Sequence, residues 1–180
     1  RELERYEDAL DAVDHALAIE PGDTAAMENK GVILCARGSG REGVEWLRKA
    51  VERNPRQGSA WYHLSQILIQ GKQSVAALQC LQAAVKHNPD DVDLLFHYAS
   101  SLLDAGNVDE ARRQYTRALD CDPDHVPSLV KLSVLLIESG EVSRGRDLVE
   151  HASDLAPMDA DILVVVAYSY RTMKQFHKAQ

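Results

Sequence analysis

Apolar residues recur at three- and four-residue steps along much of this chain, which is the spacing of one face of an α-helix. One apolar stripe covers residues 94–105 and a second covers residues 108–119. Gly106 and Asn107 interrupt the pattern between the two stripes, so they predict a turn. Two short helices joined by such a turn form an antiparallel hairpin. A lone hairpin cannot bury its apolar face, and the pattern therefore predicts hairpins that stack into a solenoid.

Proline marks a period of 34 residues, because it stands at positions 21, 55, 89, 123 and 157, and Pro127 alone is out of step. Proline lacks an N–H and disfavours helix in the residue before it, so each periodic proline predicts the end of a hairpin. The period predicts four complete repeats, at 24–57, 58–91, 92–125 and 126–159. A partial repeat with only a second helix precedes them at 1–23, and 160–180 should hold a first helix and the start of a second.

Several details of the repeats follow from this division. Asp23, Asp91 and Asp159 precede predicted helices and should cap them, and Pro127 should fall in the first turn of its helix. In 160–180 the expected core residues are Leu163, Val166 and Tyr170, and the second helix should begin near Phe176.

Small and large side chains also keep the 34-residue period. When positions are counted from the first residue of each repeat, positions 8, 20 and 27 hold small residues. Positions 11 and 24 hold large apolar or aromatic residues. The segment 58–91 shows the pattern most completely: Trp61, Leu64, Ser65, Leu68, Ala77, Leu81, Ala84 and Pro89. Over its whole length the chain resembles the tetratricopeptide repeat (TPR) family. The resemblance implies an all-α, right-handed solenoid of antiparallel helix pairs.

Composition narrows the possible functions. The 180 residues carry a formal net charge of −8, which disfavours nucleic-acid binding. The three cysteines are far apart in sequence, so neither a disulfide framework nor a zinc ribbon is indicated, and a cytoplasmic setting is favoured for this chain. The most apolar run, residues 162–167, is too short to insert in a membrane. The chain does not begin with methionine, so we expect a longer gene product.

Two short motifs suggest chemistry. "LDCDPDHVPS" at 119–128 gathers possible metal ligands, but the period makes it a corner between repeats, with a metal site as the alternative. "GSGREG" at 38–43 matches the glycine fingerprint of dinucleotide-binding folds. That fingerprint needs a preceding strand, whereas a helix is predicted there. Gly38 to Gly40 are therefore interpreted as a turn between helices, and Gly43 as one of the small periodic residues.

The seven histidines are dispersed and form no recognisable catalytic or zinc motif. His63 and His97 occupy the same repeat position, so stacking is expected to bring them side by side. Contact with a ligand, a metal site and simple exposure to solvent all remain open for this pair. We expect no catalytic residues, no cofactor and no metal.

The family resemblance implies that the first helix of each repeat lines a concave groove. Other positions account for the core, so the apolar members of this surface are expected to have no packing role, and exposed apolar rows often mark an interaction site. The residues expected to bind a peptide there are Asn29, Tyr62, His63, Gln66, Phe96, His97, Ser100, Leu103, Val130, Lys131, Val134 and Ile137.

The predicted function is a non-catalytic scaffold that binds a peptide, a helix or an extended protein segment. The carboxylate clamp and the asparagine ladder known in this family are poorly matched, since Asn29 and Lys131 are nearly the only suitable side chains. The alternative is a substrate-recruiting arm of a larger enzyme, such as a glycosyltransferase or sulfotransferase. End-to-end self-association through 160–180 is a further expectation.

Overall fold

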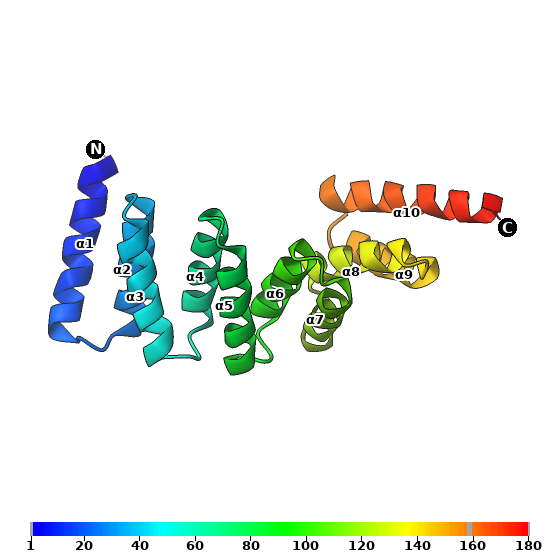
Figure 1. Cartoon of the computed structure of the whole chain (residues 1–180). Coiled ribbons are helices and arrows are strands. Elements are labelled where there is room, and N and C mark those ends of the chain that lie inside the picture. Colours follow the sequence, from blue (N-terminus) through cyan, green and yellow to red (C-terminus); the bar gives the residue numbers. More distant parts are fainter. Residues whose placement is uncertain (1, 158–159, 180) are drawn as a thin grey trace. The chain divides into compact units, whose positions relative to one another are not determined.

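The computed structural model describes residues 2–157 and 160–179, which form α-helices joined by short turns and contain no strand (Figure 1). The helices, in chain order, are α1 (Glu2–Ile19), α2 (Thr24–Ala36), α3 (Gly40–Arg53), α4 (Gly58–Gln70), α5 (Ser74–His87), α6 (Val92–Asp104), α7 (Val108–Cys121), α8 (Val126–Glu138), α9 (Val142–Leu155) and α10 (Ala160–Ala179). The all-helical prediction is confirmed.

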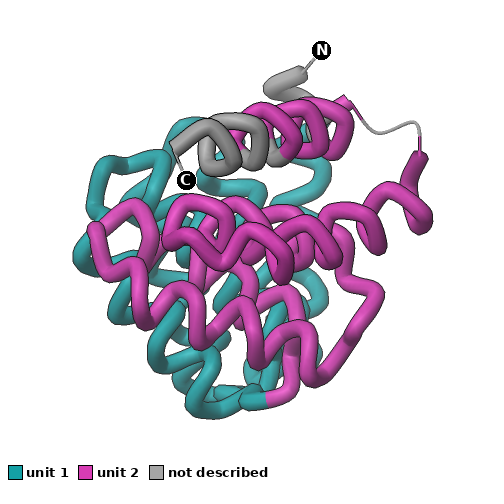
Figure 2. The backbone as a smooth tube through the Cα atoms, turned by 90° about the vertical axis from the view of Figure 1, so that its right-hand side faces the viewer, with its two compact units in different colours: residues 1–89 teal, residues 90–180 magenta. Residues whose placement is uncertain are grey.

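The helices divide into two compact units, residues 1–89 and 90–180 (Figure 2). In unit 1, α2 packs against α3 and α4 packs against α5 as hairpins, with α1 against α2 and α3 against α4. In unit 2 the hairpins are α6 with α7 and α8 with α9, α7 packs against α8, and α10 lies against both α8 and α9. Within each unit, neighbouring helix pairs therefore stack as the apolar pattern predicts.

Each hairpin turn uses the same backbone geometry. Gly38, Gly106 and Gly140 have φ values of 99°, 80° and 90°, which is the left-handed region that glycine enters without a steric penalty. The residue after each glycine donates its N–H to a carbonyl five residues back, as in Ser39 to Leu34 at 2.8 Å. In the α4–α5 turn Lys72 takes the left-handed position with a φ of 57°. This turn therefore places a side chain where its counterparts have none.

The corners between hairpins follow the prolines. Pro55, Pro89 and Pro123 each stand two residues after the last residue of a helix. Asp23 caps α2 by accepting from the N–H of Ala25 and Ala26, and Asp91 caps α6 through the N–H of Leu94 at 3.0 Å. Pro127 lies in the first turn of α8. These expectations are confirmed, while the cap expected at Asp159 lies outside the described residues.

The core consists of the periodic small and large residues. The alanines Ala50, Ala84, Ala118 and Ala152 are fully buried, as are the larger residues Leu47, Leu81 and Tyr115. Ser65 and Ser133 are also fully buried, and each satisfies its hydroxyl by donating to a carbonyl one turn earlier at 2.7 Å. Small side chains at these positions allow the paired helices to approach closely.

The expectation for 160–180 is wrong in two respects. α10 is one unbroken helix, so no second helix begins near residue 176. Leu163 and Tyr170 are 53% and 55% exposed, because no second helix covers them in the part of the chain that the structure describes, while Ile162 is deeply buried. Val166 is half-buried and packs against the cluster around Leu129. Self-association through this segment stays a prediction.

Within the described residues, no helix combines the length and apolarity needed to cross a bilayer.

Candidate functional site

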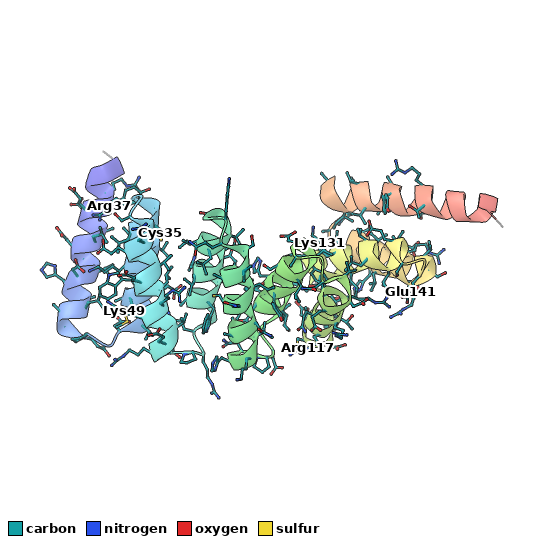
Figure 3. All side chains as sticks on the ribbon, viewed as in Figure 1. Cys35, Arg37, Lys49, Arg117, Lys131 and Glu141 are labelled. Carbon is teal, nitrogen blue, oxygen red and sulfur yellow. The ribbon has the colours of Figure 1, made fainter. Side chains whose placement is uncertain are left out.

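A cleft of about 680 Å³ opens in unit 2 between α6, α8 and α10. Its walls are mainly apolar, and Lys131 and Glu138 are the two charged residues that line it. Figure 3 labels Lys131 on α8, on the side where α10 begins. The lining residues are Phe96, Leu103, Val126, Pro127, Val130, Lys131, Val134, Leu135, Glu138, Ile162, Val164 and Val165. The first helices of two successive hairpins, α6 and α8, thus form one concave surface together with α10.

Five of the predicted site residues meet in this cleft: Phe96, Leu103, Val130, Lys131 and Val134. Lys131 is exposed and the four apolar residues are half-buried. Val130 also packs against the buried cluster of Leu129, Ala152 and Ile162, so it serves both the core and the surface. Val164 of α10, which was not among the predicted residues, is 68% exposed at the same cleft.

Ile137 does not belong to this surface, and its prediction as a groove residue is wrong. Its side chain is fully buried. It packs over Gly145 of α9, where a Cβ would lie 2.6 Å from Ile137 Cγ1. The missing side chain of the glycine leaves the space that the isoleucine fills.

Ser100 forms a hydrogen bond inside the fold. Its hydroxyl lies 2.9 Å from the hydroxyl of the fully buried Tyr115. This hydrogen bond satisfies a phenol that would otherwise lack a partner in the core. Burial raises the pKa of Tyr115, so the phenol stays protonated at neutral pH. Ser100 therefore supports the core behind the cleft.

Phe96 packs inside the fold, so the prediction that it has no packing role is wrong. The centroid of its ring lies 5.8 Å from that of Tyr115 and 5.6 Å from that of His125. His125 in turn places Nδ1 2.8 Å from the Ser128 hydroxyl and Nε2 3.6 Å from an Asp93 carboxylate oxygen. Phe96 thus joins the core to the cleft.

His97 sits beside this cluster, with its ring centroid 5.3 Å from that of Phe96. Burial lowers the pKa of His97. Asp93 and Asp91 oppose that shift, and the nearby His125 adds to it. The imidazole is consequently neutral at pH 7.

In unit 1 one predicted residue, His63, approaches a buried carboxylate that was not among the predicted site residues. Glu28 is only 8% exposed, and it accepts hydrogen bonds from Gln57 Nε2 and, at 2.8 Å, from the Ser59 hydroxyl. His63 Nε2 approaches it to 3.5 Å, and the His63 ring lies beside Tyr62. In the sequence, this polar contact could have been found from Glu28 in the first helix of one repeat and from Gln57 and Ser59 at the start of the first helix of the next.

The remaining predicted residues of unit 1 lie nearer the surface. Asn29 is exposed and Gln66 is half-buried. His63 and His97 belong to different units, so their pairing stays a prediction.

Each chemical motif contains a turn and continues into a helix. Residues 122–125 connect α7 to α8, and residues 37–39 connect α2 to α3, while Gly40 to Gly43 form the first turn of α3. Among the described side chains, no group of three or more His, Cys, Asp or Glu residues is placed to hold a metal ion. The three cysteines are free thiols.

Comparison with known proteins agrees with this architecture. A model described as tetratricopeptide repeat matches residues 1–57 and 70–126, and a second model of that description matches 102–163. Subunit 2 of the ER membrane protein complex of Xenopus tropicalis is 32% identical over 78 residues. That alignment covers 43% of this chain and 26% of the Xenopus protein, and the 2-A form of Xenopus laevis gives the same values.

Three solved structures share the fold. PilF of Pseudomonas aeruginosa aligns with a TM-score of 0.80 at 17% identity, over 99% of this chain and 81% of its own. A MamA structure aligns with a TM-score of 0.70 at 18% identity, over 86% and 91%. YrrB, described as a TPR protein with an unusual peptide-binding site, aligns with a TM-score of 0.67 at 24% identity, over 90% and 84%.

The repeat models match well over half of the sequence, and the helix pairs within each unit have the architecture that these models describe. The chain belongs to the tetratricopeptide repeat family.

Proposed function

We propose that this chain is a protein-binding scaffold and that the cleft of α6, α8 and α10 holds an apolar segment of a partner protein. Folds of the tetratricopeptide family are in general scaffolds for protein–protein interaction and typically non-catalytic. The observation that carries the proposal is the cleft itself, a concave apolar surface made by three helices of unit 2.

The composition of the lining favours a protein segment over a small molecule. Sites for small ligands combine apolar walls with several convergent polar groups that fix the orientation of the ligand. Among the described residues of this cleft, only the side chains of Lys131 and Glu138 are charged or polar. A chain segment needs fewer such groups, because its apolar side chains fill the cleft and its remaining surface stays in water.

Two valines of the cleft, which are only partly covered by the fold, provide a driving force for binding. Val164 is 68% exposed and Val134 is half-buried, although both line a concave surface. Full burial of a valine-sized side chain is favourable by about 1.5–3 kcal/mol, so covering these residues would strengthen an interaction.

Panning of a phage-displayed peptide library against the purified chain tests the proposal. The selected peptides are then titrated by fluorescence anisotropy against wild type, Val134→Glu and Val164→Glu. We expect both substitutions to weaken binding at least about tenfold, since each places a charge on the apolar surface. Val108→Glu is the matched control, because Val108 is 47% exposed on α7 and does not line the cleft.

Circular dichroism establishes that each variant is folded. Peptides that bind Val134→Glu and Val164→Glu as tightly as wild type would contradict the proposal. So would a library that yields no binder competing at this cleft.

A further inference from the structure

We infer that the cleft selects an amphipathic α-helix of a partner protein that carries an acidic and a basic side chain seven residues apart. This inference rests on the proposed function and specifies its ligand. The basis is the order of side chains along α8, where Lys131 and Glu138 stand at the two ends of an apolar stripe formed by Val134 and Leu135.

The spacing of the two charges follows from helix geometry. Residues seven apart lie on nearly the same side of a helix and about 10.5 Å apart along its axis. Lys131 and Glu138 are both exposed, and neither forms an ion pair with another described residue. The structure pairs them neither with each other nor with another described side chain, so each is available to an opposite charge on a ligand.

The negative end of the stripe is reinforced by the backbone. Glu138 is the last residue of α8, where the helix dipole concentrates partial negative charge on the terminal carbonyls. A basic side chain of the ligand is therefore favoured beside Glu138, and an acidic one beside Lys131. The charge order of the ligand then sets the direction in which it lies along α8.

The same spacing distinguishes a helix from an extended segment. Side chains on one face of a strand recur about every 6.7 Å, so same-face positions fall at about 6.7 and 13.4 Å. The separation of about 10.5 Å lies midway between these values, whereas positions i and i+7 of a helix match it. A helical ligand can also place apolar side chains at i+3 and i+4, opposite Val134 and Leu135.

Three synthetic 18-residue amphipathic peptides serve as probes. They share one leucine stripe and differ only at two positions seven residues apart, which hold Glu and Lys, Gln and Gln, or Lys and Lys. Wild type should bind the Glu/Lys peptide about 3–5-fold more tightly than the Gln/Gln peptide, as one or two exposed ion pairs allow. The preference should vanish in 1 M NaCl, where charges are screened within about 3 Å.

Lys131→Glu should reverse the selectivity, because both ends of its stripe are then negative. We expect the ratio of affinities for the Lys/Lys and Glu/Lys peptides to change about 5–10-fold in favour of Lys/Lys. Lys86→Glu is the matched control, since Lys86 is exposed on α5 in unit 1 and lies outside the cleft.

The outcomes separate this inference from the proposed function. If all three peptides bind equally and Val134→Glu abolishes binding, the cleft is a binding site but the charge selection is wrong. If a proline-substituted Glu/Lys peptide that cannot form a helix binds as tightly as its parent, the helical ligand is wrong. If peptides selected by panning also fail to bind at the cleft, the proposed function fails as well.

Discussion

Ile137 of α8 fills the space left by the missing side chain of Gly145 on α9. A Cβ on Gly145 would lie 2.6 Å from Ile137 Cγ1 and 2.8 Å from the Ser133 carbonyl oxygen. The equivalent pair eight residues apart in α2 and α3 is Cys35 and Gly43, where an added Cβ would collide with Cys35 Sγ. Where the second residue of the pair is alanine, as at Ala77 and Ala111, the first residue is not fully buried, and Leu103 opposite Ala111 is half-buried. Ile69, which is paired with Ala77, is 39% exposed.

Replacing Gly145 with alanine should destabilise the protein despite the better helix propensity of alanine, which is worth about 1 kcal/mol. The new methyl group would displace both Ile137 and the backbone at Ser133, and we expect a net loss of about 1–3 kcal/mol in the free energy of unfolding. Urea denaturation monitored by circular dichroism measures it. Gly40→Ala is the control, since nothing lies within 4 Å of a Cβ there, and it should be neutral or stabilising. Equal effects of the two substitutions would contradict the packing argument.

Lys72→Gly should stabilise the α4–α5 hairpin. Lys72 has a φ of 57°, whereas the corresponding turn residues Gly38, Gly106 and Gly140 carry no side chain. The left-handed conformation costs a non-glycine residue about 1–2 kcal/mol, and the flexibility of glycine in the unfolded chain offsets part of that gain. We expect a net increase of about 0.5–1 kcal/mol in unfolding free energy. The reciprocal change Gly106→Lys should lower it, and a loss of stability in Lys72→Gly would show that the lysine side chain has a role in the turn.

Stability should depend on His97 at mildly acidic pH. Burial lowers the pKa of His97 from its ordinary value of 6.5, with His125, Asp93 and Asp91 as the neighbouring titratable groups. The unfolded chain therefore binds this proton at a higher pH than the folded chain does. The contribution of the neutral imidazole is complete above about pH 7 and is lost as the pH falls from 6.5 through the lowered pKa.

An NMR titration of the His97 ring should consequently give a midpoint below 6.5. Between pH 7.5 and 5.5, His97→Gln should lose less stability than wild type does. A midpoint of 6.5 or higher would mean that Asp93 and Asp91 outweigh the burial of the ring, and it would contradict the predicted pH dependence.

The three thiols should react in the order of their exposure. Cys121 is exposed, Cys35 is half-buried and Cys80 is buried. Burial raises the pKa of Cys80 to about 12, an effect that Arg48 partly offsets, so almost no thiolate is present at pH 8. Because the thiolate is the reactive form, iodoacetamide should label Cys121 first and Cys80 only after unfolding. Peptide mass spectrometry over a time course follows this order, and early labelling of Cys80 would show that α5 opens readily.

Most of the fold was predictable from sequence because its determinants are local and periodic. The caps at Asp23 and Asp91, the left-handed glycines and the prolines act within a few residues of their own position. The repeated alanines and leucines identified the core for the same reason. Leu163 and Tyr170 fit this pattern but are exposed, because burial also requires a helix that packs against them.

The candidate site was less predictable because its residues depend on partners distant in sequence. Ile137 is buried through the absence of a side chain at Gly145, which a single position cannot reveal. Phe96 occupies a groove position, but its ring also meets Tyr115 and His125. Lys131, Val134 and Leu103 line the cleft as their position along the first helices suggested.

The buried carboxylate of Glu28 makes one hairpin of this array specific to its neighbour. Its hydrogen-bond donors, Gln57 and Ser59, come from the segment that follows the α2–α3 hairpin. Thirty-four residues later the corresponding positions hold Asp91 and Asp93, and a further period on they hold His125 and Pro127. If gene duplication or shuffling moved the α2–α3 hairpin in front of α6, Glu28 would face two carboxylates that cannot donate a hydrogen bond. Repeats of equal length are therefore not interchangeable. The order of the repeats depends on their buried polar contacts as well as on the 34-residue period.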